Sequence, residues 1–258
     1  MNLDQRAFAH PHQATAPLGE EDLAVGVGPW VGPWPEDPRL DPQLLADGDR
    51  RNVVDRYRYW TVEAIVADLD RRRHAFHVAI ENLGHDLNIG TVVRTANAFL
   101  AAEVHIVGRR RWNRRGAMVT DRYQHVRHHV DVAGLLAFAA AEALPVVGVD
   151  NHPGAVPLET AVLPERCVLL FGQEGPGLTP AAREAAAMTV SIAQFGSTRS
   201  INAGVAAGIA MHAWIRQHAA PGVVGFRSLP RADADRRAPL RGTGLHLVIH
   251  DAVDGGTR

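Results

Sequence analysis

The sequence predicts an α/β fold, with a mainly parallel sheet and helices on both faces. Its 258 residues suit one sizeable domain with appendages better than two compact domains. Short apolar runs typical of strands alternate with helix-like stretches through the middle of the chain, as they do in parallel sheets. Three of the strand-like runs end in Gly-rich loops with isolated polar residues, where such sheets bind their ligands.

The composition is that of a soluble globular protein. Apolar residues make up 46% and charged residues 21%, and no apolar run reaches the roughly 20 residues that cross a bilayer. The opening "MNLDQRAFAHPHQ" lacks the basic start and apolar core of an export signal. Cys167 is the single cysteine, so no intramolecular disulfide can form. We therefore expect a cytoplasmic protein.

Charge is distributed unevenly along the chain. Residues 1–49 hold nine Asp/Glu and two Arg, a net of −7. Residues 50–220 hold nineteen Arg and fifteen Asp/Glu, a net of +4, and residues 221–258 hold six Arg and four Asp, a net of +2. The total is −1, but the predicted folded part carries a basic excess, and all 27 basic residues are Arg.

The first segment, 1–73, is expected to be an N-terminal extension. Residues 1–49 contain seven of the sixteen prolines and little periodicity, which favours an extended arm. Trp30 and Trp34 are expected to dock against the folded body, because exposed tryptophans are unusual in a loose segment. Thr61 is a plausible N-cap for a short amphipathic helix in "TVEAIVADLDRRR".

The second segment, 74–220, carries the alternating pattern. Strands are expected at 76–80, 103–107, 145–150, 167–172 and 189–192, and helices at 88–99, 132–143 and 179–187. The third segment, 221–258, loses the pattern. There, 245–250 reads either as an edge strand or as part of a mobile tail.

The three Gly-rich loops are "ENLGHDLNIGTVVRTANAF", "GQEGPGLT" and "SIAQFGSTRSINAGVAAGIA". Glycine lets backbone groups approach a ligand closely. Together and in this order, the loops resemble the three motifs of the SpoU-like (TrmH-type) ribose methyltransferases of the SPOUT superfamily. The resemblance covers residues 74 to about 220. It departs from the family pattern at Leu87, where a Pro is usual, and at 192–194, which read Ile-Ala-Gln instead of Ile-Pro-Met.

The resemblance implies a C-terminal trefoil knot, a homodimer and S-adenosylmethionine as cofactor. The activity it implies is RNA 2'-O-ribose methylation, on tRNA or rRNA. The implied catalytic set is Asn88, Arg94, Glu174, Ser200 and Asn202. The implied cofactor contacts are Gly172, Glu174, Gly175, Ile192, Ser200, Ile201 and Ala203.

Arg94 is a poor candidate for a general base, because a guanidinium stays protonated at neutral pH. We expect it to bind phosphate and stabilise developing alkoxide, while water or phosphate accepts the proton.

RNA contacts are expected at the loop "GRRRWNRRG", where Trp112 lies among closely spaced arginines and could offer a stacking surface. A solvated loop is the alternative. The predicted RNA-binding residues are Arg109, Arg110, Arg111, Arg114, Arg115 and Arg199.

No metal site is expected. His125, His128 and His129 cluster in "YQHVRHHV", but no Cys or carboxylate nearby completes a ligand set. We interpret these histidines as surface or RNA-facing residues.

Two other functions stay open. One is an inactive RNA-binding relative of the same fold, which retention of the five polar catalytic positions disfavours. The other is a nucleotide-binding metabolic enzyme, which needs a loop such as G-x-G-x-x-G after its first strand. The segment "ENLGHDLNIG" does not provide that loop.

Overall fold

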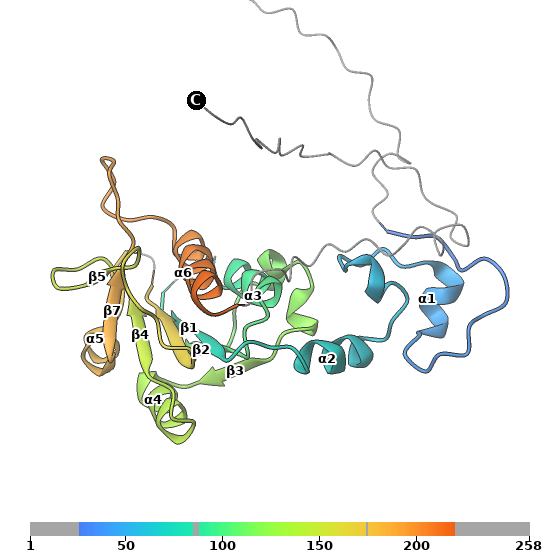
Figure 1. Cartoon of the computed structure of the whole chain (residues 1–258), viewed down its shortest axis with the longest axis horizontal. Helices are drawn as coiled ribbons and strands as arrows, with labels where there is room; N and C mark the ends of the chain where they lie inside the picture. The colour runs from blue at the N-terminus through green and yellow to red at the C-terminus, as the bar shows by residue number, and fades with distance from the viewer. Residues whose placement is uncertain (1–25, 85–87, 174, 220–258) are drawn as a thin grey trace, which may run out of the picture.

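The protein is described by a computed structural model that covers residues 26–84, 88–173 and 175–219 (Figure 1). Seven parallel strands form one sheet in the order β3-β2-β1-β6-β4-β7-β5. The strands are β1 Phe76–Asn82, β2 Val104–Gly108, β3 Val126–His129, β4 Val146–Val149, β5 Val156–Pro157, β6 Cys167–Phe171 and β7 Met188–Ser191. The expected α/β architecture is confirmed.

Helices cover both faces of the sheet, as expected. The α-helices are α1 Pro42–Asp47, α2 Val62–Asp70, α3 Ile89–Ala98, α4 Val132–Ala141, α5 Pro180–Ala185 and α6 Ala203–His218. Short 3-10 turns are η2 Asp55–Tyr57, η3 Arg114–Ala117 and η4 Thr120–Arg122. Figure 1 shows α3 and α6 on one side of the sheet and α4 and α5 on the other.

Alternate residues of each buried strand pack into two separate hydrophobic cores, because successive side chains of a strand point to opposite faces of the sheet. In β6, Leu169 and Phe171 pack with α3 and α6, whereas Val168 and Leu170 pack with α4 and α5. All five residues of β6 are buried, as expected for a central strand of a parallel sheet.

The five expected strands and three expected helices are all present, with ends shifted by one to two residues. The two edge strands, β3 and β5, were not expected. Strand β3 has the burial pattern exposed, exposed, half-buried, buried, and it carries two histidines and an arginine. Its sequence therefore lacks the continuous apolar run that marked the inner strands.

The described part of the N-terminal extension is folded, so the expectation of an extended arm is wrong for residues 26–49. Trp30 packs edge-on against Tyr59, with ring centroids 5.6 Å apart. Trp34 is 52% exposed, so its expected docking is also wrong. Helix α2 follows, capped as expected by Thr61, whose hydroxyl accepts a hydrogen bond from Ala64 N.

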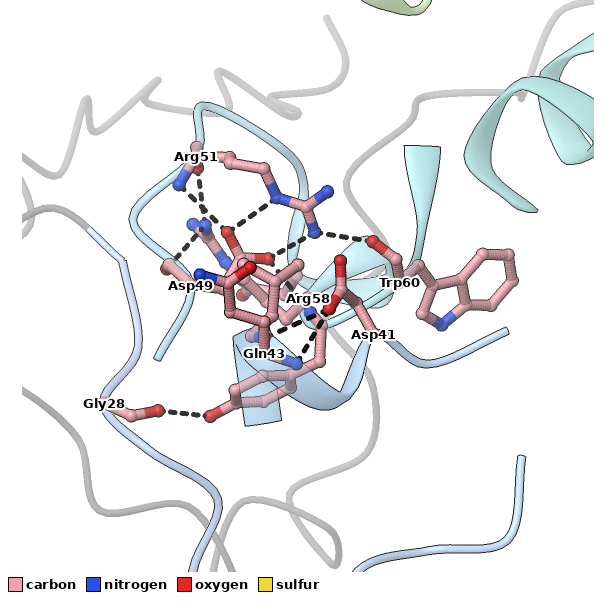
Figure 2. A network of polar contacts seen from close by, with 10 residues as sticks. Gly28, Asp41, Gln43, Asp49, Arg51, Arg58 and Trp60 are labelled. Atoms are coloured by element: carbon pink, nitrogen blue, oxygen red, sulfur yellow. Dashed lines mark hydrogen bonds and ion pairs between the residues drawn. The ribbon is translucent and has the colours of Figure 1, made fainter. Parts of the chain in front are cut away.

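A buried carboxylate organises this N-terminal segment (Figure 2). Asp49 is fully buried and pairs with Arg51 through Nε at 2.9 Å and Nη2 at 2.7 Å. It also accepts from the Tyr59 backbone N–H at 2.9 Å. The Tyr59 hydroxyl in turn donates to Gly28 O at 2.6 Å, and Arg51 donates to Trp60 O at 2.8 Å. Since three stretches of chain meet at one ion pair, the segment has a defined fold despite its many prolines.

Among the described residues, no helix is both long enough and apolar enough to cross a bilayer.

Candidate active site

A cavity of about 470 Å³ opens at the carboxyl ends of β4, β6 and β7. Its lining includes Val149, Asp150, Asn151, Phe171, Gly172, Gln173, Gly175, Pro176, Gly177, Arg183, Ile192, Gln194, Arg199, Ser200, Ile201, Asn202, Ala203 and Ala206. The size matches sites for small molecules and cofactors, and the position is the usual one for a ligand in a parallel sheet.

The loop after β6 is a tight turn that only glycine permits. Gln173 and Gly177 exchange two backbone hydrogen bonds, at 3.0 Å and 3.1 Å. Gly175 and Gly177 have φ of 93° and 74°. A Cβ on Gly172 would lie 2.0 Å from the Gly177 carbonyl carbon, so a side chain there is incompatible with the turn. At these glycines the loop presents backbone without a side chain to the cavity.

A carboxylate from the neighbouring strand holds this loop in place. Asp150 follows β4 and accepts hydrogen bonds from Leu178 N and Arg183 Nη2, both at 3.2 Å. The next residue, Asn151, donates to Arg199 O at 3.1 Å. The sequence-based prediction missed both residues. A sequence signal for Asp150 was available, because this residue follows the apolar run of a predicted strand in "PVVGVD", and the other site loops also follow such runs.

The loop after β7 leads into α6, whose N-cap is Asn202. Asn202 Oδ1 accepts hydrogen bonds from Gly204 N at 2.9 Å and Val205 N at 3.2 Å, and Asn202 Nδ2 donates to Asn88 Oδ1 at 2.8 Å. Asn88 is the residue before α3, so one amide pair joins the N-terminal ends of α3 and α6.

A glycine allows these two helices to pack closely, because a Cβ on Gly204 would lie 3.2 Å from the Thr91 side chain of α3. Gly90 instead allows α3 to approach η3, since its Cβ would lie 2.7 Å from Ala117 N. The contact with α3 thus explains why α6 contains a glycine at position 204. Gly208 does not need the same explanation, because its Cβ would make only an ordinary contact with Thr95 at 3.8 Å.

The structure brings most of the predicted catalytic and cofactor residues together. Those that line the cavity are Gly172, Gly175, Ile192, Ser200, Ile201, Asn202 and Ala203, and the predicted RNA-binding residue Arg199 lines it as well. Asn88 reaches the site through Asn202. Arg94 is exposed on α3 and is not part of the cavity lining. Glu174 lies outside the described residues, as do Leu87 and 245–250.

The arginine-rich loop after β2 is anchored beside α3. Asn82 Nδ2 donates to the carbonyls of Arg109 and Arg111 at 2.7 Å and 3.0 Å. All six predicted RNA-binding arginines are exposed. Trp112, in contrast, is half-buried against the core, with the Arg114 guanidinium 5.4 Å from its ring centre, so it offers less stacking surface than expected.

The three clustered histidines occupy different environments. His125 is exposed and contacts Asp70 at 2.8 Å, and the half-buried His128 ring contacts Gly108 O at 2.7 Å. His129 is buried, and its Nε2 lies 2.9 Å from His105 Nδ1. The interpretation of His129 as a surface residue is wrong, because its side chain points to the sheet face that α4 covers.

Two relatives of this chain carry the name of an RNA methyltransferase. The chain is 34% identical over 150 residues to an uncharacterized tRNA/rRNA methyltransferase of Mycolicibacterium smegmatis, covering 55% of this chain and 47% of that protein. It is 25% identical over 173 residues to the tRNA (guanosine(18)-2'-O)-methyltransferase of Escherichia coli K12, covering 65% and 76%. The chain spans about half the length of the first mycobacterial relatives, 53% and 47%.

A solved structure has the same fold and was determined with a ligand. The SpoU methyltransferase AviRb from Streptomyces viridochromogenes, in complex with AdoMet, superposes with a TM-score of 0.52 at 25% identity, covering 58% of this chain and 60% of AviRb. The family model of the SpoU rRNA methylases matches residues 75–212, more than half of the sequence. The chain therefore belongs to the SpoU rRNA methylase family.

Proposed function

We propose that this protein is an S-adenosylmethionine-dependent RNA 2'-O-ribose methyltransferase that acts on tRNA or rRNA. The observation that carries the proposal is the cavity at the carboxyl ends of β4, β6 and β7, whose lining includes every described residue of the predicted cofactor set. The names of the E. coli relative and of AviRb support the reaction and the cofactor.

The cavity fits a cofactor of this class. The backbone at Gly172 and Gly175 can contact an adenosine edge, since neither residue has a side chain. Ser200, Ile201 and Ala203 would hold the cofactor from the opposite loop. When bound, S-adenosylmethionine supplies an electrophilic methyl group on sulfonium sulfur, so the protein's task is to align the ribose oxygen and exclude water.

Arg94 is the proposed cationic group for the RNA. It is exposed on α3, the helix whose first turn is tied to the cavity by Asn88 and Asn202. Its permanent charge suits binding of a phosphate and stabilisation of a developing alkoxide, with water or phosphate as proton acceptor. Asn88, Glu174, Ser200 and Asn202 complete the proposed catalytic set.

The arginines of residues 109–115, with Arg199, form the proposed RNA surface. Within the described residues, the side chains of Arg110, Arg111 and Arg115 make no ion pair, so their charges are available to phosphates. Ribose 2'-hydroxyls are present in RNA and absent from DNA, which makes RNA the substrate class for this reaction.

We further infer a homodimer and a C-terminal trefoil knot, both implied by the family resemblance. Exposed apolar side chains support the dimer: Phe195 is 98% exposed, Val205 55% and Ile209 40%. Such residues at the start of α6 and in the loop before it suit an interface. The division into segments 1–73, 74–220 and 221–258 and the cytoplasmic location stay predictions.

The test is methyl transfer from labelled S-adenosylmethionine to total RNA from a strain that lacks this gene, followed by nucleoside analysis. We expect 2'-O-methylated nucleosides with the wild-type protein and none with Arg94→Ala, whose affinity for S-adenosylhomocysteine should be nearly unchanged. Arg166→Ala, an exposed arginine just before β6 at the opposite end of the strands, is the matched control. Methylation of bases, or wild-type turnover in Arg94→Ala, would contradict the proposal.

A further inference from the structure

We propose that the protein binds one divalent first-row transition metal ion, of the Zn²⁺ class, through His77, Glu103 and His105. These residues come from β1 and from the start of β2, on the sheet face that α4 covers. The site is separate from the cavity at the carboxyl ends of the strands, and the inference does not rest on the proposed methyl transfer.

The three ligand atoms converge on one point. His77 Nδ1 lies 3.0 Å from His105 Nε2, and Glu103 Oε2 lies 4.0 Å from the same His105 nitrogen. All three atoms lie within 4.8 Å of one another. Zn–N and Zn–O bonds of about 2.0–2.2 Å place tetrahedral ligand atoms about 3.3–3.5 Å apart. The two separations lie on either side of this value, so a small adjustment of the Glu103 side chain would close the site.

The three histidines form a short chain across β1, β2 and β3. His105 Nδ1 lies 2.9 Å from His129 Nε2, and His105 Nε2 lies 3.0 Å from His77 Nδ1. When His105 Nδ1 carries the proton and donates to His129, the lone pair of a neutral His105 is on Nε2, the atom that faces His77 and Glu103.

The His105 ring is fully buried, so its position is fixed by packing. Phe138 of α4 packs against the His105 ring with centroids 4.7 Å apart and fixes its orientation.

A second layer of contacts orients the proposed ligands. Glu103 Oε1 accepts from Arg127 Nε at 3.0 Å, which leaves Oε2 for a metal. His105 is held by His129 through its other nitrogen, as metal-bound histidines usually are by a second partner. The Arg127 charge opposes a further cation, so we expect weaker binding than in all-protein structural zinc sites.

The donor set selects the class of ion. Two imidazole nitrogens and one carboxylate suit Zn²⁺, Co²⁺, Ni²⁺ or Cu²⁺, whereas Mg²⁺ and Ca²⁺ prefer oxygen ligands. His77 is half-buried and the Glu103 side chain is 17% exposed, which gives an ion and a water ligand access from solvent.

The test uses the full chain, purified without a polyhistidine tag and stripped with a chelator. Calorimetric titration with Zn²⁺ should show one saturable site per chain, and Co²⁺ should give the visible absorption bands of tetrahedral coordination. Mg²⁺ should show no binding. His77→Gln and Glu103→Gln should each weaken Zn²⁺ binding at least about tenfold, with unchanged circular dichroism. His125→Gln, an exposed histidine outside the cluster, should bind as the wild type does.

Two results would overturn the inference. One is the absence of saturable Zn²⁺ binding to the wild-type chain. The other is wild-type affinity in both the His77→Gln and Glu103→Gln variants, which would place any bound ion elsewhere.

Discussion

Gly172→Ala should weaken cofactor binding at least about 100-fold through a backbone clash. The added Cβ would lie 2.0 Å from Gly177 C, 2.2 Å from Leu178 N and 2.3 Å from Gly177 O. All three are backbone atoms, so relief requires opening the Gln173–Gly177 hydrogen-bond pair. Overpacking of this kind costs about 1–3 kcal/mol, and two lost hydrogen bonds add about 1 kcal/mol each.

Even about 3 kcal/mol of this cost in the bound state corresponds to roughly 100-fold weaker binding. The assay is calorimetric titration with S-adenosylhomocysteine, alongside thermal melting to verify folding. Two further alanine variants provide a comparison, because they should weaken cofactor binding less or not at all. Gly175→Ala meets no atom within 4 Å but has φ of 93°, which costs about 1–2 kcal/mol for a residue with a Cβ.

Gly196→Ala is the matched control, because it lies in the loop before α6, meets nothing within 4 Å and has no positive φ. The expected order of affinity is wild type and Gly196→Ala, then Gly175→Ala, then Gly172→Ala. If Gly172→Ala folds and binds as tightly as Gly196→Ala, the loop after β6 does not contact the cofactor and the reasoning fails.

Two further predictions concern charge. Burial alone would raise the pKa of Asp49, but hydrogen bonds from Arg51 and from the Tyr59 N–H hold it below its ordinary 3.8. The stabilisation is therefore present above about pH 4 and is lost as the pH falls through the folded pKa. Asp49→Ala should lower the free energy of unfolding of the N-terminal segment by about 3 kcal/mol at pH 7, read by tryptophan fluorescence in urea, and should remove that acid-dependent loss. An equal loss in wild type and variant between pH 6 and pH 3 would refute it. Replacing Arg110, Arg111 and Arg115 with Gln should weaken RNA binding at low salt and reduce the slope of log K against log salt by about 2–3, measured by filter binding. An unchanged slope would show that these arginines do not contact phosphate.

The sequence was sufficient to predict the five inner strands and the loops after β6 and β7 that line the cavity, because buried parallel strands carry continuous apolar runs and these loops follow them. Edge features escaped prediction. In β3, two exposed residues and a buried histidine replace the apolar run, so His129 was placed on the surface. The fold of the N-terminal segment was not predicted for a different reason. It depends on the Asp49–Arg51 ion pair, and hydrophobic periodicity does not reveal a contact between polar residues.

Contacts between loops also lie beyond sequence patterns. Asp150 looks like any polar residue at the end of a strand, yet it contacts Leu178 and Arg183, about 30 residues further along the chain. The position of Arg94 outside the cavity lining could not be inferred either, because a motif spacing fixes a place on a helix and not the distance to a ligand.

Two carboxylates explain why the loop after β6 can be preorganised. In the sheet, β6 lies between β1 and β4. From β1, the buried Glu81 accepts from Thr179 N at 2.9 Å and from Thr179 Oγ1 at 2.6 Å. From the end of β4, Asp150 accepts from Leu178 N at 3.2 Å. The loop is thus held from both neighbouring strands at adjacent residues. Since glycines give the backbone of this loop wide conformational freedom, the two carboxylates restrict that freedom, and less binding energy would be spent on ordering the loop when a ligand binds.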